Sequence, residues 1–224
     1  MRHGQGKETS SNGEEYQGLF HEDARQGEGT LKLVNGQLYQ GSFESKKMQG
    51  HGRMDYPDGS FYLGDWRANR QHGSGKFVFS SAKIYEGEFS NGKFSGYGKH
   101  TYDRGESYEG CWSQGRKHGQ GKLVSREGTI YEGLFHNDMK HGYGKILYTK
   151  LPGNQTQAFY DGQWEADKKH GQGVEVQPNG NQYEGEFKND RRNGAGRESY
   201  REGGYYEGCW LDDLPHGQGK RVNA

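Results

Sequence analysis

A pattern of tyrosine, glycine and a second aromatic residue, Tyr-x-Gly-x-Phe/Trp, recurs along the whole chain. Seven of the eight intervals between successive copies are 23 residues long, and the remaining interval is 29. The copies begin at Tyr16, Tyr39, Tyr62, Tyr85, Tyr108, Tyr131, Tyr160, Tyr183 and Tyr206. A Gly-x-Gly pair keeps the same spacing, including the long interval. A chain that repeats one short unit in this way is expected to fold as an array of similar units.

The glycines hold fixed positions within this repeat. With 40 glycines and 28% hydrophobic residues, the composition alone is typical of a disordered segment. A flexible linker does not need its glycines at fixed positions, so the period indicates a folded chain despite this composition. We expect one continuous array over residues 1–224, with a leading half-repeat at 1–13, nine hairpin units over 14–224 and a loop insertion at about 149–159.

Each repeat reads as a β-hairpin, as in YEGEFSNGKFSGYGK at residues 85–99. Alternation along a strand sends Tyr85, Gly87 and Phe89 to one face of the sheet. Glycine offers no side chain, so a neighbouring ring can lie across the bare backbone. With a turn at residues 91–94, the expected opposite pairs are Phe89 with Gly96, Gly87 with Gly98, Tyr85 with His100, and Glu86 with Lys99.

Turn residues recur at both ends of the hairpins. One line of turns is expected at Asn91-Gly92, Gln114-Gly115, Asn137-Asp138 and Asn189-Asp190, and a second at Asn12-Gly13, Asn35-Gly36, Asp58-Gly59, Asn179-Gly180 and Gly203. The predicted fold is all-β: an elongated single-layer antiparallel sheet of tandem 23-residue hairpins. Nine hairpins and a leading strand give about 19 strands, which would span roughly 85 to 90 Å.

The repeated segments YEGEF, NGK, HGQGK and YPDG resemble the MORN repeat, named for the membrane occupation and recognition nexus. The resemblance covers the full chain and implies a β-hairpin repeat fold. Members of this family include cytoskeletal scaffolds, ciliary proteins, membrane-junction proteins and regulatory segments of enzymes. The resemblance to protist and ciliary members implies a non-catalytic scaffold at the cytoskeleton. The resemblance also leaves open that the chain is a regulatory segment of a larger enzyme.

No arrangement of residues indicates catalysis or a cofactor. Gly-x-Gly-Lys has neither the spacing of a Walker loop nor that of a dinucleotide-binding loop. Six of the ten histidines precede a Gly-x-Gly, so they belong to the period and not to a metal cluster. No Ser, Cys or carboxylate stands beside a base outside the repeat. We predict no enzymatic activity, no cofactor and no metal site within one chain.

The charges predict no nucleic-acid partner, because the formal net charge is zero. No apolar run approaches the roughly 20 residues of a membrane span, and a cytoplasmic protein is expected. Acidic residues are expected opposite the basic residues that follow Gly-x-Gly, which cancels much of that charge. Cations on the first turn line are expected to stay unpaired, and they support an alternative function as a phosphoinositide-binding module. These candidates are Arg116, Lys117, Lys168, Lys169, Arg191 and Arg192.

Two further surfaces are candidates for protein partners. An aromatic strip that could hold a helix or an extended peptide is expected at Tyr56, Phe79, Tyr102, Tyr148 and Tyr200; the alternative is that the sheet curls and the rings cover one another. The last repeat lacks the basic turn residues of the others and ends in an unpaired strand edge, which predicts a homodimer. The candidate dimer residues are Cys209, Trp210, Leu211, Leu214 and His216, with a metal site shared between Cys209 and His216 of two chains left open.

Overall fold

The computed structural model of the chain describes residues 1–149 and 156–224 and consists mainly of β-strands joined by turns. The strands are β1 (Gly4–Thr9), β2 (Glu15–His21), β3 (Ala24–Lys32), β4 (Leu38–Glu44), β5 (Lys47–Asp55), β6 (Phe61–Arg67), β7 (Arg70–Val78), β8 (Ile84–Ser90), β9 (Lys93–Thr101), β10 (Ser107–Ser113), β11 (Arg116–Val124), β12 (Ile130–His136), β13 (Met139–Tyr148), β14 (Ala158–Glu165), β15 (Lys168–Val176), β16 (Gln182–Lys188), β17 (Arg191–Ser199), β18 (Tyr205–Leu211) and β19 (Leu214–Val222). One short 3-10 turn covers Asp103–Gly105. No helix among the described residues is long and apolar enough to cross a membrane.

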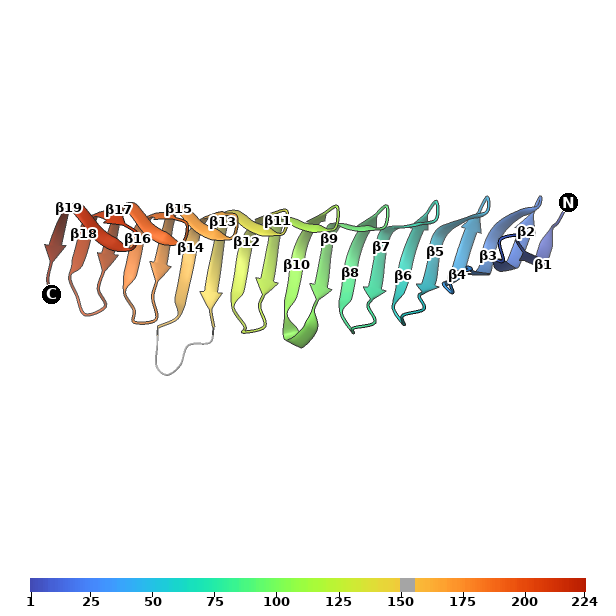
Figure 1. Cartoon of the computed structure of the whole chain (residues 1–224), viewed down its shortest axis with the longest axis horizontal. Coiled ribbons are helices and arrows are strands. Elements are labelled where there is room, and N and C mark those ends of the chain that lie inside the picture. Colours follow the sequence, from blue (N-terminus) through green and yellow to red (C-terminus); the bar gives the residue numbers. More distant parts are fainter. Residues whose placement is uncertain (150–155) are drawn as a thin grey trace. The chain divides into compact units, whose positions relative to one another are not determined.

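The strands follow one another in chain order in an antiparallel sheet of 19 strands (Figure 1). This confirms the predicted all-β fold of tandem hairpins.

The chain divides into two compact units. The first unit is Met1–Asp103 with Trp112–Gly115, and the second is Arg104–Cys111 with Arg116–Ala224. The expected length of the array stays a prediction. Residues 150–155 of the expected insertion lie outside the described part of the chain.

The register within the hairpin of β8 and β9 confirms three of the four expected pairs. Gly87 lies opposite Gly98, Tyr85 opposite His100, and Glu86 opposite Lys99. The pairing of Phe89 with Gly96 was wrong, because Phe89 lies opposite Phe94 and a β-bulge interrupts the ladder between these pairs. Phe89 does face a glycine, but that glycine is Gly73 on β7 of the preceding hairpin.

The cause of the bulge is the turn. The turn holds only two residues, Asn91 and Gly92, and both have positive φ values, 50° and 78°. Positive φ at both central residues is the geometry of the two-residue type I′ turn, which suits the twist of a hairpin. Because this turn is shorter than the four residues expected, the bulge on β9 takes up the surplus residues, with Gly96 at φ 56°.

The repeating tyrosines form the core. Eight of them, from Tyr16 to Tyr183, are 0 or 1% exposed. Each ring lies across two glycines that face each other on adjacent strands, as Gly162 and Gly173 do under Tyr160. A Cβ added at Gly173 would lie 2.5 Å from the Tyr160 ring, so only glycine leaves room. The Tyr160 hydroxyl donates a hydrogen bond of 2.8 Å to the carbonyl of Gln163.

Edge-to-face ring contacts link successive repeats within each unit. Tyr39 contacts Phe43 of its own repeat and Trp66 of the next, with centroids 5.2 and 5.1 Å apart. In the second unit, Tyr183 contacts Phe187 and Trp210 in the same way, at 5.1 and 5.2 Å. Such aromatic pairs stabilise by about 0.5–1.5 kcal/mol each beyond the area that they bury. The core of each unit is therefore a series of rings held by nearest-neighbour contacts.

Candidate protein-binding face

One variable position lies above this regular core. It is the second residue after each two-residue turn, and we call its occupant the cover residue. Phe94 shows its placement: the Phe94 ring stacks on Tyr85 with centroids 3.6 Å apart and planes 4° from parallel. We call the face toward which the tyrosine rings point the inner face, and the opposite face the outer face. The cover residues are Arg25, Met48, Gln71, Phe94, Lys117, Lys140, Lys169, Arg192 and Pro215.

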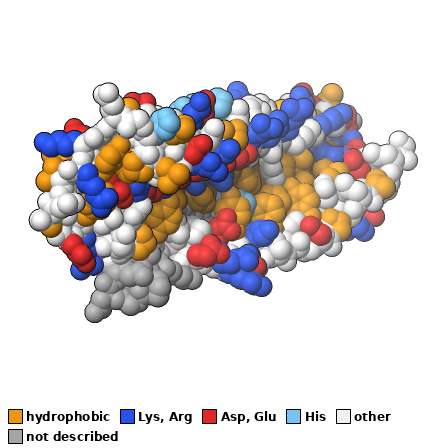
Figure 2. All heavy atoms as spheres, turned by 60° about the vertical axis from the view of Figure 1, so that its left-hand side comes forward, with side chains coloured by type: hydrophobic (Ala, Val, Ile, Leu, Met, Phe, Trp, Pro, Cys, Tyr) orange, Lys and Arg blue, Asp and Glu red, His pale blue; other side chains and the backbone are white. Residues whose placement is uncertain are grey.

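In the first unit, the inner face is largely apolar. Met48 and Met54 are 7 and 3% exposed, and together with Tyr56 and Gln71 they line a hollow of about 390 Å³. The Gln71 amide donates a hydrogen bond of 3.0 Å to the Tyr56 hydroxyl at its edge. Figure 2 shows hydrophobic side chains gathered on one face between margins of charged side chains.

The cover residues of the second unit are cations until Pro215. Lys117 places Nζ 5.7 Å from the Tyr108 ring centroid and 5.6 Å from that of Phe135. Lys140 places Nζ 4.8 Å from the centroid of Trp164. A cation over an aromatic face is attracted by the ring quadrupole, so these lysines can cover the rings without apolar bulk. Burial lowers the pKa of Lys140 below its ordinary value, although Asp167 and Asp190 oppose the shift.

The next two cations of the second unit belong to a partly buried ion-pair network. Arg192 Nη1 lies 2.9 Å from Glu198 Oε1, and Arg192 Nη2 lies 3.7 Å from Glu175 Oε2. Lys169 pairs with Glu175 as well. The Arg192 guanidinium also covers the ring of Tyr183, with Cζ 4.8 Å from its centroid.

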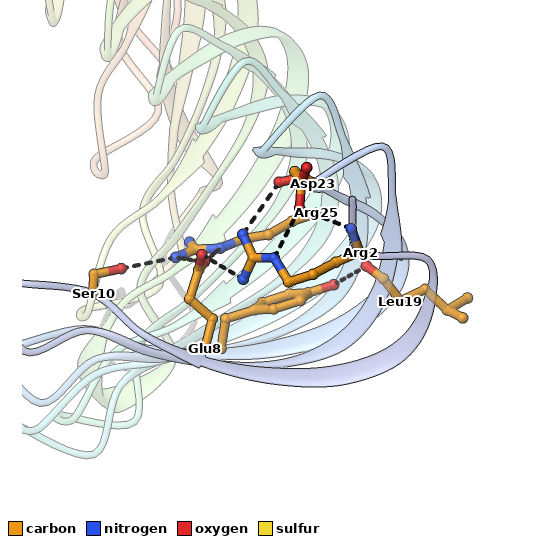
Figure 3. Close-up of polar contacts among 7 residues, drawn as sticks. Arg2, Glu8, Ser10, Leu19, Asp23 and Arg25 are labelled. Atoms are coloured by element: carbon orange, nitrogen blue, oxygen red, sulfur yellow. Dashed lines mark hydrogen bonds and ion pairs between the residues drawn. The ribbon is translucent and has the colours of Figure 1, made fainter.

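A similar network lies at the start of the first unit (Figure 3). The Arg25 guanidinium covers Tyr16 and bonds to Glu8 and Ser10, with donor–acceptor distances of 3.0 and 3.2 Å. Arg2 Nη1 lies 2.9 Å from the other oxygen of Glu8. Burial by itself would raise the pKa of Glu8, but the hydrogen bonds from Arg2 and Arg25 bring it below its usual value.

The basic turn-line candidates divide between two environments. Arg116, Lys168 and Arg191 are exposed beside the turns, whereas Lys117, Lys169 and Arg192 are cover residues on the inner face. The expectation that all six are unpaired was wrong. Lys169 and Arg192 pair with glutamates as described, and Arg191 lies 3.5 Å from Asp212. The sequence could have indicated these ion pairs, because a glutamate stands six residues after Lys169 and six after Arg192.

The expected ladder of acidic and basic residues on the outer face has the predicted register but different ion pairs. Glu132 lies opposite Lys145 in its own hairpin, as expected. The ion pairs instead join different hairpins: Lys122 Nζ lies 2.6 Å from Glu132, and Lys145 Nζ lies 3.3 Å from Asp161. These groups are about half exposed, so each pair contributes little to stability.

The five residues of the aromatic strip are all partly buried, so neither complete exposure nor complete mutual cover describes them. In the first unit, the ring of Tyr56 lies 5.6 Å from Phe77, and the ring of Phe79 lies 4.6 Å from the same residue. Tyr102 packs on His100 at 4.0 Å. In the second unit, Tyr148 lines a hollow of about 520 Å³, and Tyr200 lies under the Arg221 guanidinium.

The candidate dimer residues of the last repeat differ in how far they are exposed. Leu211 and Leu214 lie opposite each other and are 47 and 68% exposed. Trp210 is 4% exposed and donates a 3.1 Å hydrogen bond to the Gly196 carbonyl, so its ring already belongs to the core. Cys209 and His216 are exposed. Within the described residues, no three His, Cys, Asp or Glu side chains gather as a metal site.

The solved structures to which this chain is similar share little sequence identity with it. The TCP10 domain of Danio rerio CPAP is 12% identical, with 97% of each chain covered and a TM-score of 0.45. The TCP domain of Drosophila melanogaster SAS-4, solved in complex with a proline-rich motif of Ana2, is 13% identical, with 80% of this chain and 86% of that chain covered and a TM-score of 0.41. A comparison of the sequence with curated proteins found no match.

The family comparison covers nearly the whole chain. The MORN repeat matches ten segments, at residues 1–15, 16–38, 39–61, 62–81, 85–107, 108–130, 131–150, 160–182, 183–205 and 206–224. The matches carry the tyrosine and glycine positions that build the core described above. The chain therefore belongs to the MORN repeat family.

Proposed function

We propose that this chain is a non-catalytic scaffold that binds a segment of a partner protein on its inner face. The observation that carries the proposal is the contrast between a uniform core and variable cover residues. Tyrosine occupies the same place in every repeat, while the residue above it changes from Met48 to Gln71, Phe94 and Lys117. Positions that are free to vary over a fixed framework are where binding specificity can reside.

The first unit offers an apolar anchor point for such a segment. Its hollow of about 390 Å³ is lined by Met48, Met54 and Tyr56, with Gln71 and Asn69 as polar groups in the same lining. Methionine side chains adapt to different apolar partners, and a few polar groups fix the orientation of a bound chain. A buried side chain of the partner would fill this hollow.

A random-peptide display library panned on the full chain tests the proposal. We expect enriched peptides that lose at least tenfold in affinity for a Gln71→Trp variant, which fills the hollow. Leu63→Trp is the matched control, because it adds the same ring at a residue that lies on the outer face and is 40% exposed. Peptides that fail to enrich, or that respond equally to both variants, would contradict binding on the inner face.

We also propose self-association through the last repeat. The exposed pair of Leu211 and Leu214 supports it, together with β19, where every residue but the last is exposed. Burial of leucines and pairing of strand edges about a two-fold axis would satisfy both features. Light scattering should show a dimer for the chain and a monomer for Leu211→Lys/Leu214→Lys; a monomeric parent would refute this proposal.

The proposed location is cytoplasmic, at the cytoskeleton, as in the protist and ciliary MORN proteins that the sequence resembles. Fractionation of cells that express the tagged chain tests this. The chain should sediment with the detergent-resistant cytoskeleton and move to the soluble fraction when filaments are depolymerised. Recovery in the soluble fraction throughout would count against the cytoskeletal location without affecting peptide binding.

A further inference from the structure

Five of the cover residues are cations, and they differ in whether the chain itself supplies an acidic partner. Arg25 pairs with Glu8, and Lys169 and Arg192 pair with Glu175. Arg192 has Glu198 as a second partner. The side chains of Lys117 and Lys140 form no ion pair among the described residues. The chain therefore contains an internal comparison between satisfied and unsatisfied cations at one structural position.

The sequence explains the difference. The residue six positions after the cover residue is Glu175 for Lys169 and Glu198 for Arg192, but it is Leu123 for Lys117 and Ile146 for Lys140. Leu123 and Ile146 lie on either side of Tyr131 in adjacent strands of the second unit, and neither can accept a hydrogen bond. The two lysines thus have apolar residues at the position where the hairpins of Lys169 and Arg192 supply glutamates, and neither has a glutamate like Glu8, which pairs with Arg25 from β1.

Within the described residues, the aspartates at the turns bind the backbone of these lysines, and none of them lies within ion-pair distance of either Nζ. Asp138 Oδ1 accepts the backbone N–H of Lys117 at 2.9 Å, and Asp167 Oδ1 accepts that of Lys140 at 2.8 Å. Residues 150–155, KLPGNQ, contain no acidic side chain. A lysine held over aromatic rings in a partly dry site gains most from a charged partner, because screening by water is weaker there.

We propose that Lys117 and Lys140 form an acidic-segment site: they bind Asp or Glu side chains of the partner protein, which supply the negative charge that Glu175 and Glu198 supply to Lys169 and Arg192. The two lysines belong to successive hairpins, so their sites are roughly 10 Å apart, two strand spacings. An acidic chain that crosses the strands reaches both. This inference rests on the proposed function, since it names the chemistry of the segment that the inner face binds.

The test compares the full chain with two double variants. Lys117→Met/Lys140→Met removes both charges and uses the side chain that already covers a core tyrosine at Met48. Leu123→Glu/Ile146→Glu keeps the lysines but gives them the internal partners that Lys169 and Arg192 have. Lys122→Met is the control, because Lys122 lies on the outer face and pairs with Glu132 there. Far-ultraviolet circular dichroism and thermal melting establish that each variant is folded.

The probes are a displayed random-peptide library, a synthetic copy of its most enriched peptide, and phosphatidylcholine vesicles with and without phosphatidylinositol 4,5-bisphosphate. Peptides selected by the parent should be rich in Asp and Glu and should bind each double variant at least tenfold more weakly, with unchanged binding to Lys122→Met. Their affinity should also fall as salt rises.

Three other results would each overturn the inference, and they separate it from the proposed function. Enriched peptides without acidic residues, or with equal affinity for the Met variant, would remove the acidic-segment site but leave peptide binding intact. Loss of vesicle binding in the Met variant, without acidic peptides from the library, would assign the lysines to a lipid headgroup. Absence of any enriched peptide would overturn both proposals.

Discussion

The inner faces of the two units cover the same core tyrosine rings with different side chains. Apart from Arg25 over Tyr16, the first unit covers its tyrosine rings with the uncharged residues Met48, Gln71 and Phe94. In the second unit, Lys117 and Arg192 place charged groups over the same ring faces. Yet the tyrosines below are equally buried, at 0 or 1% exposure. The framework of glycine, tyrosine and edge-to-face aromatic contacts therefore tolerates either chemistry above it, and the two units can differ in what they bind while sharing one fold.

The strongest test of a common framework is to close the space under the rings in both units. A Cβ at Gly29 would lie 2.5 Å from the Tyr16 hydroxyl, and one at Gly173 would lie 2.5 Å from the Tyr160 ring. Gly29→Ala and Gly173→Ala should each cost about 3 kcal/mol or more, because backbone and ring must both move. Urea denaturation of the two variants measures the cost.

Gly59→Ala is the control for this pair. Gly59 has a φ of 85° and open space around it, so the substitution meets backbone strain alone and should cost about 1 kcal/mol. A much smaller cost at Gly173 than at Gly29 would show that the second unit depends less on the glycine pairs.

The next test separates the two kinds of cover residue. Phe94 stacks on Tyr85 and also meets Phe89 and Trp112 edge to face, at 5.5 and 5.4 Å. Phe94→Ala should therefore destabilise the chain by about 2–3 kcal/mol. Lys140→Ala should cost less than about 1 kcal/mol, since it removes a partly desolvated charge along with its packing. Thermal melting compares them, and equal losses would argue against a specific binding role for Lys140.

A smaller effect is expected from the tyrosine hydroxyls. Tyr62 and Tyr131 each donate a 2.9 Å hydrogen bond to a backbone carbonyl three residues along the chain. Tyr62→Phe and Tyr131→Phe should each cost about 1–2 kcal/mol, because the buried carbonyl loses its partner. The costs should match within error when measured by urea denaturation. A clear difference would mean that Lys140, whose Nζ lies 5.6 Å from the Tyr131 ring centroid, changes the strength of the hydrogen bond.

The smallest expected difference lies in alkaline titration. Burial raises the pKa of Tyr183 to about 12, and the charge of Arg192 limits the rise. Burial raises the pKa of Tyr62 further, and Asp65 adds to it. Because the folded-state pKa is raised, stability is complete below pH 10 and declines as the pH rises toward 12. In ¹³C-tyrosine NMR spectra, the Tyr183 signal should shift at lower pH than that of Tyr62; the reverse order would contradict the effect of the covering cation.

The repeat alone was enough to predict the fold, since its period places the tyrosines, glycines and turns in register. The bulge was missed because two turn lengths are compatible with Asn91-Gly92-Lys93-Phe94, and only the positive φ values of the shorter turn decide between them. That two-residue difference also hid the cover position, because a four-residue turn would have put Phe94 in the loop instead of over Tyr85.

The ion pairs of the inner face were less predictable. Glu175 and Glu198 occupy positions where other repeats carry Leu123 or Ile146, so alignment of the repeats would have exposed them. The face to which Arg192 turns depends on the bulge, and its 6% exposure follows from packing against Trp210, which belongs to the next repeat. Contacts of this kind depend on geometry that a pattern of residue types does not contain.

The two lines of turns differ in how they tolerate change. Every two-residue turn forms a backbone hydrogen bond to the preceding repeat, as where the N–H of Asp190 bonds to the Lys169 carbonyl at 3.0 Å. The turns at the other margin close on themselves, as where the N–H of Leu33 bonds to the Gln37 carbonyl at 2.9 Å, and only some also bond to a neighbouring turn, as where the N–H of Arg201 bonds to Asn181 Oδ1 at 3.2 Å. The six extra residues of the long interval fall on this second margin. Fluorophores, tags or whole domains inserted there should leave the neighbouring repeats in register, which makes this margin the place to label the protein or to attach cargo.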